Sequence, residues 1–222
     1  MVAEGNHASA SDEDYLAALL GLEEDAVPLI QARLAERLGV SAAAVSEAVH
    51  RLVRRGFLDA GPRSLHLSAA GRKVAGSVVR RHRLAECLLV DVLGLAWEKV
   101  HLEAVRWQHI ISSEVETGLV ALLGDPATCP HGNRIPGCRS PGQLSPEFRL
   151  AAARPGPVRI ARISERLQTD NEALRLLARS HLTPGSTATV TEVSPETINL
   201  STPHGDFQVP IPVAEEVWAS PG

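Results

Sequence analysis

The sequence predicts a mainly α-helical protein with a small β-barrel at its C-terminal end. Apolar residues recur at helical spacing along most of the chain up to Leu123, and short runs alternating apolar and polar residues fill the last third. A segment rich in proline, glycine and cysteine lies between them. With 222 residues and 44% hydrophobic content, the chain can bury a sizeable core. We expect three domains, over residues 1–70, 71–147 and 156–222.

The first of these domains has the pattern of a winged helix-turn-helix. We expect a helix from about Ser11, as its cap, to Leu22, a second over PLIQARLAERLGV that ends at Gly39, and a third that is capped by Ser41. The segments FLDA and LHLS, on either side of GPRS, predict a two-stranded wing. Two short helices, a tight turn and a wing are typical of a DNA-binding head.

Basic residues are concentrated in the same part of the chain. From Gln31 to Arg83 there are eleven Lys and Arg against three Asp and Glu, a net charge of +8, whereas the rest carries −12. A basic face suits a phosphate backbone. We therefore expect double-stranded DNA as partner; a merely solvated charged face or a packing hairpin are the alternatives. The candidate contacts are short side chains for base edges and arginines for phosphates, namely Ser41, Ala43, Ala44, Ser46, Glu47, Arg33, Arg51 and Arg63.

Two long helices are expected next, from Ser68 to Leu93 and from Trp97 to about Leu123, with a turn at Gly94. Long amphipathic helices that follow a DNA-binding head usually dimerise it, because paired half-sites need a two-fold protein. We therefore expect a homodimer. After a loop over 125–142, four alternating segments predict a barrel of SH3 type with one inserted helix, from Asn171 to Ser180.

The two long helices carry ionisable groups on faces that should be buried. A helix turns about 100° per residue, so the first helix gathers several residues within roughly an 80° arc. They are Val78, His82, Glu86, Leu89 and Leu93. The second helix gathers others within about a 100° arc. They are His101, Val105, Gln108 and His109. If the helices pack antiparallel, two imidazoles and a carboxylate meet, which suits a divalent metal; hydrogen-bonded or exposed histidines are the alternative.

The loop TCPHGNRIPGC supplies donors of the same kind. Cys129 and His131 lie two residues apart beside a proline and a glycine, so a rigid turn presents a thiolate and an imidazole. Asp170 or Glu172 could add an oxygen from the C-terminal domain. Such a site also suits a metallohydrolase. The chain has no His-Glu-x-x-His spacing and no obvious general base apart from these ligands, so we expect no enzyme.

These motifs together resemble a known family. In their order, RHRLAECLL, GLAWEKVHLEAVRWQHIISSEVE and HGNRIPG resemble the iron- and manganese-dependent repressors of the diphtheria toxin repressor family, from about Asp14 to the end. The resemblance implies a winged helix-turn-helix domain, a helical metal-binding and dimerisation domain and an SH3-like domain. It also implies a divalent metal as corepressor, and metallated dimers that bind palindromic operators of metal-uptake genes.

The resemblance also implies ligands. The family's ancillary site corresponds to His82, Glu86 and His101, with Asp170 where the SH3-like domain donates a carboxylate. In the manganese-type members, the counterparts of Glu86, Cys129, His131 and Asp170 form the secondary site.

Two further positions match the iron-type members. Arg83 and Asn133 correspond to residues that hold an anion at the ancillary site of those members.

The family's primary site is less intact in this chain. Asp14 stands where manganese-type members have aspartate, and His109 matches the primary histidine. Val105 and Gln108 stand where the family has a thiolate or carboxylate and a glutamate, and two missing anions should weaken the binding of a hard cation. Either this site, with Asp14, Gln108 and His109, is vestigial and the His82 cluster senses metal, or a neighbour such as Glu103 compensates.

We therefore expect a cytoplasmic, manganese-responsive repressor with Mn²⁺ as corepressor. The alternatives are an iron-responsive repressor that uses Fe²⁺ and, less favoured, a metal-dependent hydrolase; Zn²⁺ could substitute at a His/Cys site. Three cysteines suit a reducing compartment. No apolar stretch approaches the ~20 residues that cross a bilayer, so no membrane partner is expected.

Overall fold

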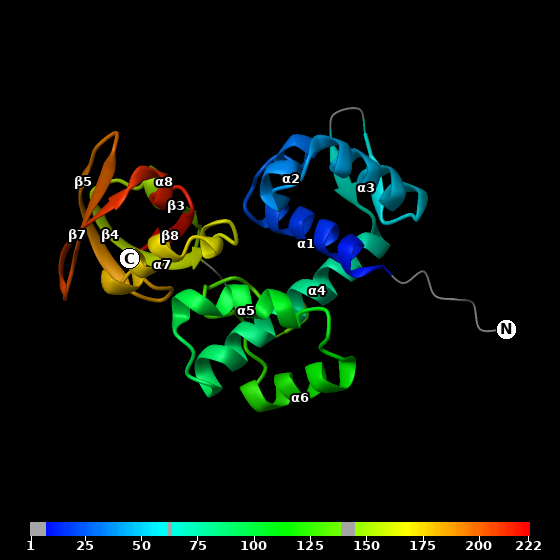
Figure 1. Cartoon of the computed structure of the whole chain (residues 1–222). Helices are drawn as coiled ribbons and strands as arrows, with labels where there is room; N and C mark the ends of the chain where they lie inside the picture. Colours follow the sequence, from blue (N-terminus) through cyan, green and yellow to red (C-terminus); the bar gives the residue numbers. More distant parts are fainter. Residues whose placement is uncertain (1–7, 62–63, 139–144) are drawn as a thin grey trace. The chain divides into compact units, whose positions relative to one another are not determined.

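The computed structural model describes residues 8–61, 64–138 and 145–222 (Figure 1). The chain divides into two compact units, Met1–Arg81 and His82–Gly222. The division falls within helix α4 (Ala69–Cys87), which begins in the first unit and ends in the second. In the described part of the chain, no helix combines the length and the apolar character that crossing a membrane requires.

The first unit has the helix-turn-helix and wing that the sequence predicts. It contains α1 (Ala10–Glu24), α2 (Gln31–Leu38), α3 (Ala42–Arg54), and the antiparallel strands β1 (Leu58–Ala60) and β2 (Leu65–Leu67). Their apolar faces share one core, in which Leu16, Leu19, Leu34, Val45 and Leu52 are fully buried. Packing of these faces, rather than helix propensity alone, holds such short helices in place.

The ends of these helices follow capping chemistry. Helix α1 begins earlier than expected, because Ser9, not Ser11, is the cap: the Ser9 hydroxyl accepts a hydrogen bond from the Asp12 amide at 3.2 Å. Ser41 caps α3 as predicted, accepting from the Ala44 amide at 3.2 Å. Gly39 ends α2 with φ +64°, a conformation that glycine adopts without strain.

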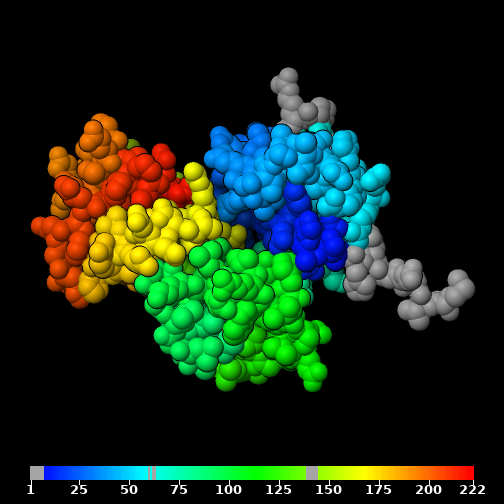
Figure 2. All heavy atoms as spheres, in the orientation of Figure 1, coloured from blue at the N-terminus to red at the C-terminus, as the bar shows by residue number. Residues whose placement is uncertain are grey.

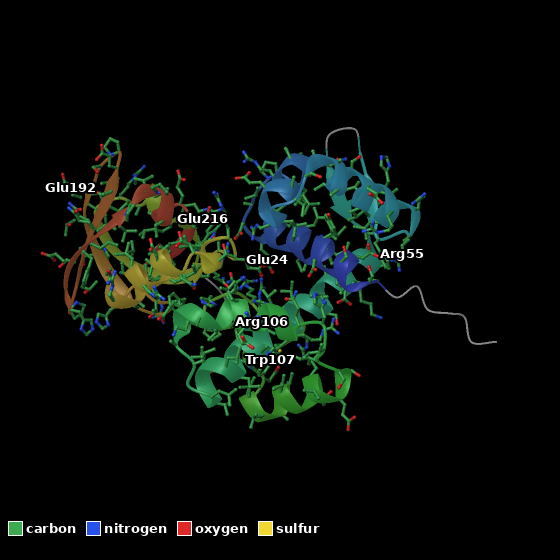
Figure 3. All side chains as sticks on the ribbon, in the orientation of Figure 1. Glu24, Arg55, Arg106, Trp107, Glu192 and Glu216 are labelled. Carbon is green, nitrogen blue, oxygen red and sulfur yellow. The ribbon has the colours of Figure 1, made fainter. Side chains whose placement is uncertain are left out.

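A buried carboxylate ties α1 to the end of α3. Asp12 is fully buried, and its two oxygens accept hydrogen bonds from Arg51, at 2.8 Å, and from Arg55, which is labelled in Figure 3. Burial alone would raise the pKa of Asp12, but the Arg51 guanidinium and the Ser9 cap hold it below its usual value of 3.8.

The second unit begins with the helical segment. After α4 come a π-helical turn (Leu88–Val92), a 3₁₀ turn (Trp97–Lys99), α5 (Val100–Trp107) and α6 (Ser113–Leu123). The prediction of one helix from Trp97 to Leu123 is therefore wrong. Ser112 starts α6 as a new helix by accepting a hydrogen bond from the Val115 amide at 3.2 Å, and serine favours such caps over helix interiors.

The rest of the second unit is built on an antiparallel sheet. Its strands are β3 (Phe148–Arg149), β4 (Gly156–Ile163), β5 (Thr187–Val193), β6 (Thr197–Thr202), β7 (Gly205–Pro210) and β8 (Val217–Pro221), in the order β3-β8-β4-β5-β6-β7. Helices α7 (Asn171–Arg179) and α8 (Ile211–Ala214) complete this part. Among the described strands, the pairings do not join β3 to β7, so the antiparallel sheet does not confirm the small β-barrel that the sequence predicts.

Within the second unit, the helical segment packs directly against the segment that carries the strands, green against yellow in Figure 2. Trp97, just before α5, packs on the core of the sheet, in which Ile160, Ile163 and Leu174 are fully buried. The loop 129–137 follows α6 and is joined to the end of β4, which brings residues of three distant segments together.

The Asp12 contacts generate a prediction about the first unit. Asp12→Asn should lower the free energy of opening of residues 10–81 by about 2 kcal/mol at neutral pH, because it removes the charge that two arginines contact. Because the pKa is depressed in the fold, this contribution should be present above 3.8 and be lost as pH falls below that value. Hydrogen-exchange mass spectrometry of the full chain measures the difference. Glu36→Gln, which breaks the exposed Arg33–Glu36 pair, is the control and should cost below about 0.5 kcal/mol; equal effects would contradict the account.

Candidate metal centre

The candidate site is centred on one buried carboxylate near the end of α4. Glu86 is 1% exposed, and its Oε1 lies 3.2 Å from His82 Nε2, 3.4 Å from His101 Nδ1 and 3.1 Å from His131 Nδ1. His82 and Glu86 share a face of α4 at (i, i+4), and His101 comes from α5. The structure therefore brings together two helices and the loop, as the sequence predicts.

These donors form two overlapping groups with metal-ligand chemistry. The first is His82, Glu86 and His101; the second is Glu86, Cys129 and His131, and within each group the donor atoms lie within 4.8 Å of one another. All five residues are buried. In the described part of the chain, Glu86 Oε2 and His131 Nε2 are buried without a hydrogen-bond partner. Buried polar atoms are seldom left without a partner, and both are atoms of kinds that bind divalent cations, so the donor set fits a metal.

Charge is distributed unevenly within the cluster. Burial opposes ionisation of Glu86, but His131 and His82 hold its pKa well below the ordinary value. Burial would lower the pKa of His82, yet the Glu86 charge raises it; burial and His82 lower the pKa of His101. Burial and the neighbouring Glu86 raise the pKa of the Cys129 thiol well above 9.0. A cation that takes these donors must therefore displace the proton of the Cys129 thiol and compete with protonation of His82.

Local backbone geometry fixes the loop that carries Cys129 and His131. Gly132 has φ +82°, and a Cβ there would lie 2.2 Å from the Ala161 carbonyl oxygen, so no other residue fits without movement. The Ile163 amide donates to the His131 carbonyl at 2.8 Å, and Asn133 Nδ2 donates to the Ile163 carbonyl at 2.8 Å. Trp97 covers His131, with ring centroids 4.9 Å apart. The end of β4 thereby positions His131.

Asp170 does not join the cluster. It is exposed, and its Oδ1 caps α7 by accepting hydrogen bonds from the Glu172 and Ala173 amides, each at 3.0 Å. The C-terminal carboxylate near the cluster is Glu165, which sequence reasoning missed. Burial alone would raise its pKa, but Arg83 and the charges of His82 and His101 lower it. Its position directly after the strand-like segment VRIARIS was the available signal.

Arg83 is buried in the second unit and is hydrogen-bonded there. It is 1% exposed, and its guanidinium donates to Glu165 Oε1 at 2.8 Å and to the Arg134 carbonyl. Asn133 is bonded to Ile163. These two residues, which the resemblance assigned to an anion, thus have hydrogen-bond partners inside the protein.

The residues expected at the primary site do not all lie in the same unit. Asp14 lies on α1 in the first unit. In the second unit, Gln108 is buried beside His82, with its Oε1 2.9 Å from His82 Nδ1, and its Nε2 is 3.1 Å from His109 Nε2. Val105 is 41% exposed. The two oxygens of Glu103 accept hydrogen bonds from Arg106 (2.8 Å) and Trp107 (3.0 Å), both labelled in Figure 3.

Most of the expected DNA contacts lie on α3. Ser41, Ala43 and Glu47 are exposed, and Ala44 and Ser46 are half-buried. Arg33, on α2, pairs with Glu36 at 2.7 Å. Arg51 is held by Asp12, so its guanidinium has a structural contact that the sequence did not predict. Arg63 lies outside the described residues.

Comparison with known proteins agrees with this architecture. A family model described as "Iron dependent repressor, N-terminal DNA binding domain" matches residues 7–64, and "Iron dependent repressor, metal binding and dimerisation domain" matches residues 68–137. The iron-dependent repressor IdeR of Mycobacterium tuberculosis is 40% identical over 217 residues, covering 92% of this chain and 90% of the relative. The diphtheria toxin repressor of Corynebacterium diphtheriae is 40% identical over 183 residues, covering 78% and 81%.

Solved structures of metal-dependent repressors have the same fold as this chain. A manganese-dependent transcriptional repressor in complex with manganese superposes with a TM-score of 0.84 and 32% identity, covering 95% of this chain and all of the other. The repressor ScaR with bound Zn²⁺ superposes with a TM-score of 0.77 and 26% identity, covering 95% and 99%. Sequence, domain order and fold agree, and the chain belongs to the iron-dependent repressor family, which includes the diphtheria toxin repressors.

Proposed function

We propose that this chain is a manganese-responsive transcriptional repressor whose corepressor binds at the cluster of His82, Glu86, His101, Cys129 and His131. The observation that carries the proposal is the single oxygen, Glu86 Oε1, with three imidazole nitrogens within 3.1 to 3.4 Å in a buried place. A bound divalent cation would supply positive charge that offsets burial of this carboxylate. Membership of a repressor family makes the chain a regulator rather than an enzyme.

The donor set bears on which metal binds. Imidazole and carboxylate suit Mn²⁺ and Fe²⁺, whereas the Cys129 sulfur and the histidines also favour Zn²⁺. The manganese-bound structural relative supports Mn²⁺, and the relatives named iron-dependent repressors support Fe²⁺ as the alternative. We favour Mn²⁺, because Glu86, Cys129 and His131 form one donor group and match the secondary site of the manganese-type members. Asp14 remains a predicted ligand of a second ion.

The first unit would bind operator DNA. In a helix-turn-helix, the second helix enters the major groove with its first turn against base edges. On α3 this turn exposes Ala43, and Glu47 follows one turn later. Alanine offers only apolar contact, for instance to thymine methyl groups, so DNA shape and phosphate contacts would carry much of the specificity.

The second unit would form the dimer. Several large apolar side chains on and beside α5 and α6 are exposed: Leu102, Val105, Ile110, Val115 and Leu122. Ile110 is 77% exposed and Leu122 is 62% exposed, and apolar side chains of this size are what a protein interface covers. We propose that a second copy covers this face, and that the C-terminal sheet is an SH3-like domain.

Removing one imidazole tests the metal site. His82→Ala should weaken Mn²⁺ binding by at least about 100-fold, since it deletes a ligand rather than an outer-shell partner. It should also abolish the Mn²⁺-dependent gain in affinity for the duplex that the wild type selects from a random library, and leave weak, salt-sensitive binding. His181→Ala, an exposed histidine of the same unit, is the control. If Mn²⁺ still raised the DNA affinity of His82→Ala as it does that of the wild type, the proposal would be wrong.

Replacing the sulfur tests metal preference. Cys129→Ser should weaken Zn²⁺ binding more than Mn²⁺ binding, by about tenfold in the ratio, because Zn²⁺ is the softer ion. Competition titration with a chromogenic chelator measures both constants, and Cys138→Ser serves as control. Losses for both ions no larger than those of Cys138→Ser would show that Cys129 is not a ligand.

A charge placed on the apolar face tests the dimer. Ile110→Glu should shift the protein to a monomer and weaken DNA binding, since burying an unpaired carboxylate in the interface is costly. Val193→Glu, at an exposed apolar position on β5, should leave the assembly unchanged. Sedimentation velocity distinguishes them, and a dimeric Ile110→Glu variant would locate the interface elsewhere.

A further inference from the structure

Gln108 occupies an unusual position for an uncharged side chain. It follows α5 directly, is 8% exposed, and lies between two histidines. Its Oε1 is 2.9 Å from His82 Nδ1, and its Nε2 is 3.1 Å from His109 Nε2. His101 and Gln108 are seven residues apart, about two helical turns, so both reach His82 from the same face.

The amide fixes the direction of these hydrogen bonds. An amide oxygen only accepts and an amide nitrogen only donates, so His82 Nδ1 carries a proton and His109 Nε2 accepts one. His82 Nε2 is then the nitrogen that faces His101 at 3.1 Å and Glu86 at 3.2 Å. Outer-shell groups that hold one ring nitrogen of a histidine decide which nitrogen is offered to a metal.

We propose that Gln108 is a positioning residue of the metal centre rather than a ligand: it holds His82 by Nδ1–H, so that Nε2 is presented to the ion. The proposal rests on the proposed function, because it takes the His82 cluster as the metal site. It also accounts for His109, whose Nε2 lone pair is engaged by the Gln108 amide instead of by an ion. The resemblance implies a primary-site ligand at position 108, but in this proposal Gln108 supports the neighbouring metal site at His82.

Three variants separate positioning from ligation and from mere packing. Gln108→Met keeps the length but can neither accept from His82 nor donate to His109. Gln108→Glu can still accept from His82 Nδ1–H, and its stronger acceptor should hold the ring at least as well. Gln208→Met, the same change at an exposed position on β7, is the matched control.

The first measurement is equilibrium titration of the full-length protein with Mn²⁺ and with Zn²⁺. We expect Gln108→Met to lose 10- to 100-fold in affinity at the cluster, about the effect of removing an outer-shell partner. Gln108→Glu should bind as tightly as the wild type or more tightly, and Gln208→Met should be unchanged. A Gln108→Met variant that matches the wild type overturns the inference. So does a tenfold loss in Gln108→Glu, which is the result expected if the amide donated to His82.

The second measurement needs no metal. Two-dimensional ¹H–¹⁵N spectra of the histidine rings should show a proton on His82 Nδ1 in the wild type and in Gln108→Glu, and should lose that signal in Gln108→Met, where Nδ1 has no acceptor. If Gln108→Met does not fold, the spectrum and affinity of Gln108→Glu decide. The proposed function is judged separately: a wild type that binds neither ion at the His82 cluster ends that proposal, whereas normal wild-type binding with an unmoved tautomer in Gln108→Met ends only this one.

Discussion

The second unit depends on the burial of one charge. Glu86 is ionised and almost completely buried, and an isolated carboxylate in such surroundings would cost several kcal/mol. Three imidazoles offset that cost, and they come from α4, α5 and the loop after α6. The contacts of α4 with α5 and the sharp turn at Gly132 together place those rings around one oxygen.

Hydrogen bonds also connect the residues around Glu86 to the C-terminal sheet. His131 and Asn133 are hydrogen-bonded to Ile163 at the end of β4, and Arg83 on α4 is paired with Glu165 two residues further along the chain. A change in the position of His131 would therefore be transmitted to β4 through the backbone. A ligand shifts a conformational equilibrium only by as much as its affinity differs between the two states, and these contacts are where such a difference would arise within this unit.

Much of this architecture could be predicted from spacing. The (i, i+4) pair of His82 and Glu86 and the Cys-Pro-His-Gly loop indicated the cluster, because ligand types at fixed separations are local properties. The break between α5 and α6 was missed, since an apolar periodicity continues across Ser112 while the cap interrupts the helix. Asp170 is predicted as an oxygen donor, and by the resemblance as a ligand, but a carboxylate before a helix serves as a cap. Glu165 directly follows the strand-like segment VRIARIS, yet only the folded path of the chain after β4 places it beside Arg83. The pairing of Asp12 with Arg51, 39 residues apart, likewise depends on tertiary packing.

The most direct test is to remove the buried charge without changing its shape. Titration of Glu86→Gln with Mn²⁺ and Zn²⁺ should show at least about 100-fold weaker binding than the wild type, while circular dichroism shows the same helical content. This result is expected because the amide keeps the volume of Glu86 but offers no anionic oxygen to the ion. Binding of wild-type strength in Glu86→Gln would contradict the account, because the carboxylate at the centre of the three imidazoles would then not be what holds the metal.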